Sequence, residues 1–256
     1  MSNFGSPPAK PGVYTLLLNM TNKRTIVNNN ISNRYRINDL IINLRHNPFV
    51  WQPSEYANTF LKILDSIDLF GLKICDVGCG SGILAIFCAL RGGKVTALDL
   101  NPYAIKLCRE NAILNNVSIN CIQSNVFSAI SKDNEKFDLI VCNPPTFPIT
   151  NLISKQTALY WNQNIDSREV LDEVLNTGKL YLNSDGKILI SSSSEQIWDK
   201  TKEALSSCEY WKIHKKITFK LNESYKFFVD EWYKFNLIKK IKGVYTHEVH
   251  FIEAKF

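Results

Sequence analysis

The segment DVGCGSG contains the first residues of the chain whose types and spacing could hold a ligand. Asp76 ends a short apolar run, LKICDV, and three glycines then follow at alternate positions: Gly78, Gly80 and Gly82. Glycines at such a turn let the backbone fold tightly and let a ligand approach the main chain. The segment predicts a ligand-binding loop between a strand and a helix, or, alternatively, a structural glycine turn whose aspartate caps the helix.

The position of Asp76 discriminates between two classes of cofactor. A dinucleotide site prefers the spacing G-x-G-x-x-G, because a helix N-terminus there receives a pyrophosphate. Here the spacing is G-x-G-x-G, and the carboxylate of Asp76 would repel a phosphate. The pattern suits a cofactor without phosphate and with positive charge, such as S-adenosylmethionine with its sulfonium and α-amino groups. A second acid, Asp99, ends the next strand in ALDLNP, where a carboxylate can accept hydrogen bonds from a ribose diol.

A second unusual feature is the end of the apolar run FDLIVC at Asn143-Pro144-Pro145. Two prolines cannot continue a strand or a helix. The turn could therefore simply end an edge strand, or it could place polar groups at a functional edge. Four serines, residues 191–194, end a later strand at the same predicted edge, where they could contact a substrate, although capping of the next helix by Ser194 already explains part of this run.

Strand and helix patterns alternate from Leu72 onward. Apolar runs of strand character lie at 72–77, 94–100, 117–124, 137–143 and 186–194, and two more strands are expected at 211–221 and 246–256. Continuous apolar strands separated by helices indicate a parallel sheet covered on both faces. We expect an α/β fold with a doubly wound, mostly parallel, seven-stranded sheet. Lysines alternating with aromatics in WKIHKKITFK fit an edge strand better than a nucleic-acid surface.

The front of the chain has a different pattern. Residues 13–28 are expected to form a hairpin, and RINDLIINLRHN, residues 36–47, a short helix. We therefore predict an N-terminal appendage over 1–48 that forms part of the acceptor cleft, and a cofactor-binding domain over 49–256.

Taken together, these motifs resemble those of the class I, Rossmann-like, S-adenosylmethionine-dependent methyltransferases. DVGCGSG is similar to their first motif, ALDLNP to the acidic second and NPPTF to the fourth. The arrangement is closest to the protein-glutamine (release-factor) and small-domain RNA guanine methyltransferases. The resemblance implies that Asn143 and Pro144 accept the two N–H bonds of an acceptor NH₂, and that Phe147 covers the acceptor. It also implies that Asn125 contacts adenine, and that Glu55 and Thr59 line the methionine end of the cofactor.

The sequence departs from this family at two places. The family carries an aromatic directly after the prolines, but Thr146 stands there and Phe147 follows one residue later. Where the family usually has Asp, this chain has Asn125, whose Oδ1 can still accept the adenine hydrogen bond.

The overall composition narrows the class of protein. The chain of 256 residues carries a net charge of +6 and seven cysteines without a CxxC pair. This favours reduced, buried thiols over disulfides or a metal site. No signal-peptide pattern and no apolar stretch of membrane-spanning length occur, so we expect a cytoplasmic protein without a membrane partner.

The predicted activity is methyl transfer from S-adenosylmethionine to nitrogen, with the acceptor open between a protein and an RNA. A small-molecule acceptor is the alternative, and an NAD-dependent oxidoreductase or a non-catalytic binding module are rivals from other classes. No sequence feature indicates an oligomeric state.

Overall fold

The computed structural model describes residues 32–144, 168–193, 195–221, 229–230, 233–234 and 238–256. The expected hairpin over 13–28 and the positions of Thr146 and Phe147 lie outside these residues.

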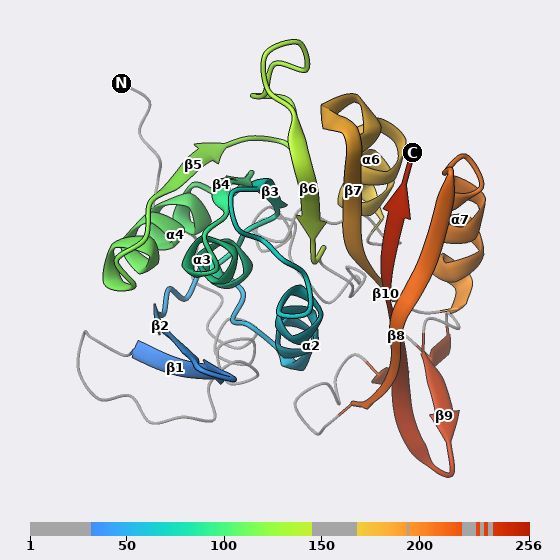
Figure 1. Ribbon diagram of the computed structural model, residues 1–256. Helices are drawn as coiled ribbons and strands as arrows, with labels where there is room; N and C mark the ends of the chain where they lie inside the picture. Colours follow the sequence, from blue (N-terminus) through green and yellow to red (C-terminus); the bar gives the residue numbers. More distant parts are fainter. Residues whose placement is uncertain (1–31, 145–167, 194, 222–228, 231–232, 235–237) are drawn as a thin grey trace, which may run out of the picture.

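A single sheet runs through the centre of the molecule (Figure 1). Its strands follow the order β5-β4-β3-β6-β7-β10-β8, and the short β9 pairs with β10. Neighbours from β5 to β7 are parallel, whereas β10 is antiparallel to β7, β8 and β9. The expected seven-stranded, mostly parallel sheet is thus confirmed, with β9 as a short addition. The strands are β3 (Lys73–Val77), β4 (Lys94–Asp99), β5 (Ile119–Gln123), β6 (Phe137–Cys142), β7 (Leu182–Ser193), β8 (Tyr210–Lys220), β9 (Lys239–Ile241) and β10 (Val244–Lys255).

Helices cover both faces of the sheet, because the strands are apolar on both sides (Figure 1). One face packs against α2 (Glu55–Leu64), α3 (Ile83–Leu90) and α4 (Pro102–Leu114). The other face packs against α6 (Glu169–Thr177) and α7 (Glu195–Leu205), and the 3₁₀ turn η1 (Gly178–Tyr181) links α6 to β7.

Local signals in the sequence set where two of these helices begin. The Ser54 side chain accepts a hydrogen bond from Tyr56 N at the start of α2. Asn101 caps α4 in the same way, and Pro102 occupies the first helical position. Such caps satisfy backbone N–H groups that a helix start leaves unpaired.

The expected helix over 36–47 is wrong. These residues form most of a hairpin, β1 (Ser32–Ile37) and β2 (Leu40–Arg45), whose turn includes Asn38 with a φ of +49°. Ile42 and Leu44 are buried at alternate positions, a period of two that marks a strand. Both belong to the hydrophobic core that the sheet shares with α2 and α3. A division of the chain at residue 48 stays a prediction.

The structure confirms the predicted edge strand and excludes the edge-strand alternative for the run before Asn143. β8 is an edge strand, as the lysine pattern indicated, and most of its residues are exposed. β6 instead lies between β3 and β7, so Asn143 does not follow an edge strand. The Asn-Pro-Pro turn therefore follows a central strand, at the carboxyl edge where ligands bind to parallel sheets.

Candidate active site

The strand register places the predicted site residues along one edge of the sheet. Val77 pairs with Leu98 on one side and with Cys142 on the other, and Asp99 pairs with Gln123. The residues that follow these pairs, Gly78 and Asn143, therefore lie in the same row as Asp99, at the carboxyl ends of the parallel strands. The structure thus brings together motifs that are more than sixty residues apart in the sequence.

Asp76 is a buried carboxylate beneath this edge, 1% exposed. Its Oδ2 accepts a hydrogen bond from Ala85 N at 3.1 Å, in the first turn of α3. Asp76 therefore supplies the cap that Gly82, which has no side chain, cannot give. Burial raises the pKa of Asp76, the Ala85 N–H lowers it, and the charge of Asp99 raises it; together they bring the pKa to about 7. Within the described part of the chain, no cationic side chain pairs with it.

Asp99 is held by backbone donors on both sides. Oδ2 accepts from Gly80 N and Oδ1 from Asn101 N, each at 2.9 Å. Burial raises the pKa of Asp99, while these two hydrogen bonds lower it. The side chain is partly exposed, and each carboxylate oxygen has a second lone pair for a further donor.

The three glycines of the loop differ in their surroundings. All have positive φ, +74° at Gly78, +54° at Gly80 and +84° at Gly82. A Cβ added at Gly78 or Gly80 would meet open space, whereas at Gly82 it would lie 2.6 Å from Cys108 Sγ. Gly78 and Gly80 therefore leave room for a cofactor against the main chain. Gly82 is required for packing between the loop and α4.

Asn125 is exposed in a tight loop after β5. Its backbone N donates to Ser128 Oγ at 3.2 Å. Ser124 Oγ donates to Val126 O at 2.8 Å and accepts from Ala129 N at 3.1 Å. Val126 has a φ of +48°, which is strained for a β-branched residue. The serine hydrogen bonds hold this strained loop and present Asn125 next to the end of β5.

Asn143 is half-buried and Pro144 is buried at the end of β6. The hydroxyl of Ser191, on β7, donates to Asn143 Oδ1 at 2.6 Å. The expected partner Phe147 lies beyond the residues that the structure describes.

Glu55 and Thr59 lie in the first turns of α2, Glu55 exposed and Thr59 partly so. The Thr59 hydroxyl donates to the Glu55 carbonyl oxygen at 3.3 Å, within the helix. No hydrogen bond between described residues joins either side chain to the glycine loop or to Asp99.

Two asparagines that position the site were not predicted from the sequence. Asn111 is fully buried on α4; its Nδ2 donates to Ser81 O at 2.9 Å and its Oδ1 accepts from Arg45 N at 2.7 Å. Asn101 caps α4, and its Nδ2 donates to Phe49 O at 2.8 Å. An Asn on the otherwise apolar face of α4 was the available signal for the first, and an Asn before Pro102 for the second.

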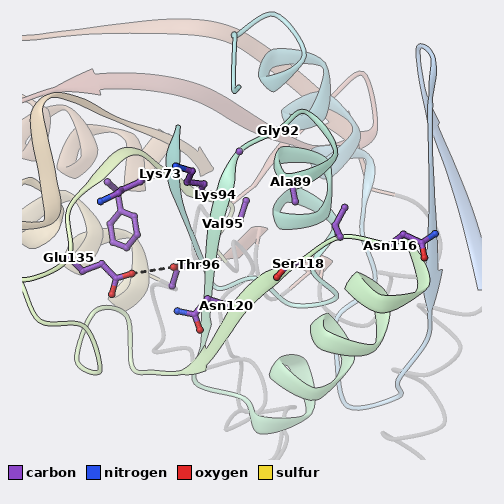
Figure 2. Close-up of a pocket in the computed structure, with 13 residues that line it drawn as sticks. Lys73, Ala89, Gly92, Lys94, Val95, Thr96, Asn116, Ser118, Asn120 and Glu135 are labelled. Atoms are coloured by element: carbon purple, nitrogen blue, oxygen red, sulfur yellow. Dashed lines mark hydrogen bonds between the residues drawn. The ribbon is translucent and has the colours of Figure 1, made fainter. Parts of the chain in front are cut away.

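A cavity of about 670 Å³ lies at the opposite edge of the sheet (Figure 2). Its lining includes Lys73 and Lys94, which are the paired first residues of β3 and β4, and Phe137, the first residue of β6. The Thr96 hydroxyl donates to Glu135 Oε1 at 3.3 Å across it (Figure 2). None of the predicted site residues lines this cavity, so it is separate from the carboxyl-edge site.

The described residues contain no helix long and apolar enough to cross a membrane. They also contain no group of three His, Cys, Asp or Glu side chains placed to hold a metal ion. All seven cysteines lie in the described part of the chain; none is in a disulfide, and six are buried.

Comparisons with known proteins agree with this geometry. The family model "Methyltransferase small domain" matches residues 55–221. A putative protein N5-glutamine methyltransferase of Methanocaldococcus jannaschii is 35% identical over 156 residues, which is 60% of this chain and 77% of that protein. A release factor glutamine methyltransferase of Fusobacterium nucleatum is 49% identical over 76 residues, but these make up only 28% of this chain and 21% of the relative.

Among solved structures, the fold resembles a 16S rRNA N2 G1207 methyltransferase of T. thermophilus in complex with AdoMet and guanosine. The TM-score is 0.61 at 16% identity, over 88% of this chain and 50% of that one. This likeness concerns the fold, whereas the family match and the M. jannaschii relative concern the sequence itself. The chain therefore belongs to the Methyltransferase small domain family and is an S-adenosylmethionine-dependent methyltransferase.

Proposed function

We propose that this enzyme methylates a nitrogen of an amide or amino group on a protein or RNA acceptor. The observation that carries the proposal is the position of Asn143 and Pro144 at the end of β6. This strand is the direct neighbour of β3, which leads into the glycine loop. Hydrogen-bond acceptors at that point suit an acceptor that presents N–H groups.

The cofactor is held by the row of strand ends. Asp76 faces the positive charge of its methionine end through the space left by Gly78 and Gly80. Asp99 accepts hydrogen bonds from the ribose hydroxyls, and Asn125 Oδ1 accepts one from the adenine amino group. Glu55 and Thr59 approach the methionine end from α2, while Gly82 acts through packing against Cys108. S-adenosylmethionine supplies an electrophilic methyl group on its sulfonium when bound.

Asn143 and Pro144 orient the acceptor. Asn143 Oδ1 and the Pro144 carbonyl oxygen accept the two N–H bonds of the acceptor nitrogen, so its lone pair points at the methyl carbon. Holding reacting atoms in line in this way contributes several kcal/mol to lowering the barrier. As the bond between nitrogen and the methyl carbon forms, the carbon–sulfur bond of the donor would break and S-adenosylhomocysteine would leave. No general base is needed beforehand, because the nitrogen becomes acidic only as it gains the methyl group and would then lose its proton to water. Phe147 is proposed to cover the acceptor.

The names of the relatives support nitrogen as the acceptor atom. The M. jannaschii relative is named for the N5 position of glutamine, and the F. nucleatum relative for glutamine. The names of both relatives indicate protein substrates. The fold of this chain also resembles that of a 16S rRNA methyltransferase. These similarities support our proposal that the acceptor is a protein or an RNA.

The test is transfer of a labelled methyl group into cell extract that is then separated into protein, RNA and small molecules. We expect label in the protein or RNA fraction, and at least a hundredfold less with Asn143→Ala at unchanged affinity for S-adenosylhomocysteine. Label confined to the small-molecule fraction would contradict the proposed acceptor class. Calorimetry with S-adenosylhomocysteine and with NAD tests the cofactor separately.

A further inference from the structure

Ser191 lies directly beside Asn143 on the neighbouring strand. Strands β6 and β7 run side by side (Figure 1). Cys142 of β6 pairs with Ile190 of β7, so the next residues of the two parallel strands are Asn143 and Ser191. Ser191 is 0% exposed, and its Oγ donates to Asn143 Oδ1 at 2.6 Å. This is the one hydrogen bond that its hydroxyl makes to a described residue.

We propose that Ser191 is a positioning residue that fixes the orientation of the Asn143 carboxamide. The inference rests on the proposed role of Asn143 in binding the acceptor nitrogen. With Oδ1 engaged by Ser191, one lone pair of this oxygen is used and the second is left for the acceptor N–H.

The amide needs such a constraint because its two ends are opposite in character. A half-turn of the carboxamide would replace Oδ1, which accepts, by Nδ2, which donates, and a donor facing the acceptor NH₂ would oppose its binding. After that turn, Ser191 Oγ could accept from Nδ2, but its own buried O–H would lose its acceptor. A buried polar hydrogen without a partner disfavours that state by roughly tenfold or more.

The next residue, Ser192, serves as a matched control. Successive side chains of a strand point to opposite faces, and Ser192 points away from Asn143. Its hydroxyl lies 2.9 Å from Thr201 Oγ1 on α7, and Thr201 Oγ1 also accepts from Arg168 Nη1 at 2.9 Å. Ser192 is 1% exposed, so the two serines are equally buried but belong to different hydrogen-bond networks.

The activity test uses three variants of the full chain: Ser191→Ala, Ser191→Cys and Ser192→Ala. The probe is tritiated S-adenosylmethionine with the extract fraction that accepts label from the wild type. We expect the maximal rate to fall about tenfold in Ser191→Ala, at unchanged affinity for S-adenosylhomocysteine. Ser191→Cys fills nearly the same volume but donates weakly, so it should resemble Ala. Ser192→Ala should keep the wild-type rate and lose thermal stability.

A wild-type rate in Ser191→Ala or Ser191→Cys would overturn the proposal. So would an equal loss of rate in Ser192→Ala, which would point to a general effect of the strand.

A second measurement does not depend on the acceptor. In protein labelled with ¹⁵N-asparagine, the side-chain NH₂ signals of Asn143 are assigned by their loss in Asn143→Ala. We expect them to shift in Ser191→Ala and to stay in place in Ser192→Ala; unchanged signals in Ser191→Ala would show that the hydrogen bond is absent. If the wild type labels no fraction at all, the proposed function fails, while this signal still decides the role of Ser191.

Discussion

Asp76 and Glu253 are both buried carboxylates, 1% and 4% exposed, but their electrostatic surroundings are opposite. Glu253 lies on β10 and is surrounded by donors. Its Oε1 is within 3.2 Å of Lys187 Nζ and of Lys212 Nζ and accepts from the Tyr210 hydroxyl at 2.9 Å, and its Oε2 lies 3.0 Å from His214 Nε2. Burial alone would raise the pKa of Glu253, but these four partners outweigh it and hold it at about 2.

Asp76 has one backbone hydrogen bond and no cationic partner among the described residues, and its pKa is raised to about 7. Side chains of the same protein balance the charge of Glu253, and their contacts with its carboxylate link β10 to β7 and β8. Asp76 has no such partner among the described residues, which fits its proposed role of binding the positive charge of the cofactor. The comparison teaches that burial alone does not distinguish the two carboxylates, whereas the lack of a counter-ion among the described residues does, and this difference supports Asp76 as the proposed cofactor-binding acid.

Removing the charge of Asp76 should have the largest effect, which we expect on the affinity for the cofactor. Asp76→Asn keeps an oxygen that can accept from Ala85 N but cannot attract a cation. We expect the affinity for S-adenosylhomocysteine at pH 8 to fall at least about 30-fold, since breaking a buried charge pair costs about 2 kcal/mol or more. Calorimetry measures this, with Glu253→Gln as the control that should bind within twofold of the wild type. Equal losses in both variants would remove the distinction between the two carboxylates.

Removing the charge of Glu253 should affect stability instead. Glu253→Gln weakens several charge-assisted hydrogen bonds, so the free energy of unfolding at pH 7 should fall by about 2 kcal/mol. The folded-state pKa of Glu253 is lowered from 4.5 to about 2. Its stabilising contribution is therefore complete above pH 4.5 and is lost as the pH falls towards 2. Urea unfolding at several pH values measures both effects, and a variant as stable as the wild type at pH 7 would contradict them.

The raised pKa of Asp76 predicts a pH-dependent affinity for the cofactor. Positive charge binds the ionised carboxylate, and a group with a pKa of about 7 is mostly protonated at pH 6. The affinity for S-adenosylhomocysteine should therefore be about tenfold weaker at pH 6 than at pH 8, with proton uptake by the buffer on binding near pH 7. Calorimetry in two buffers of different ionisation enthalpy detects these protons. The dependence should disappear in Asp76→Asn, and its persistence there would assign it to another group.

A carboxylate introduced at Asn125, where solvent screens its charge, should have the smallest effect on cofactor affinity. Asn125 is exposed, and either Asn or Asp can accept a hydrogen bond from the adenine amino group. Asn125→Asp should therefore change the affinity for S-adenosylhomocysteine by less than about threefold. A tenfold change in a binding titration would show that the site at the end of β5 is as shielded from water as Asp76.

The central sheet could be predicted because its strands are continuous apolar runs between glycine, proline and asparagine signals. The glycine loop and the end of β6 were placed at one edge by the rule that parallel strands end together. The hairpin β1–β2 was mistaken for a helix because Ile41, an exposed apolar residue, hid the alternation of buried Ile42 and Leu44.

Contacts between distant residues could not be predicted in this way. The hydrogen bond from Ser191 to Asn143 depends on the register of β6 and β7, and the one from Asn111 to Ser81 depends on how α4 packs. The apolar face of α4 could have indicated that Asn111 is buried, but the sequence does not identify the hydrogen-bond partner of Asn111 or of Ser191. The roles assigned to the site residues, among them Asp76, Asp99, Asn125 and Asn143, stay predictions.

Asn111, buried on α4, and Asn115, half-buried just after this helix, indicate what would follow if the front of the chain were cut away. Asn115 hydrogen-bonds both the N–H and the carbonyl of Asn43, and Asn111 accepts from Arg45 N while also reaching Ser81 O. Removal of residues 1–47 would take the Asn43 and Arg45 partners away from these two amides, and Asn111 also contacts the glycine loop at Ser81 O. We therefore expect that the hairpin β1–β2 stabilises the glycine loop through Asn111, and that a minimal catalytic fragment must include this hairpin.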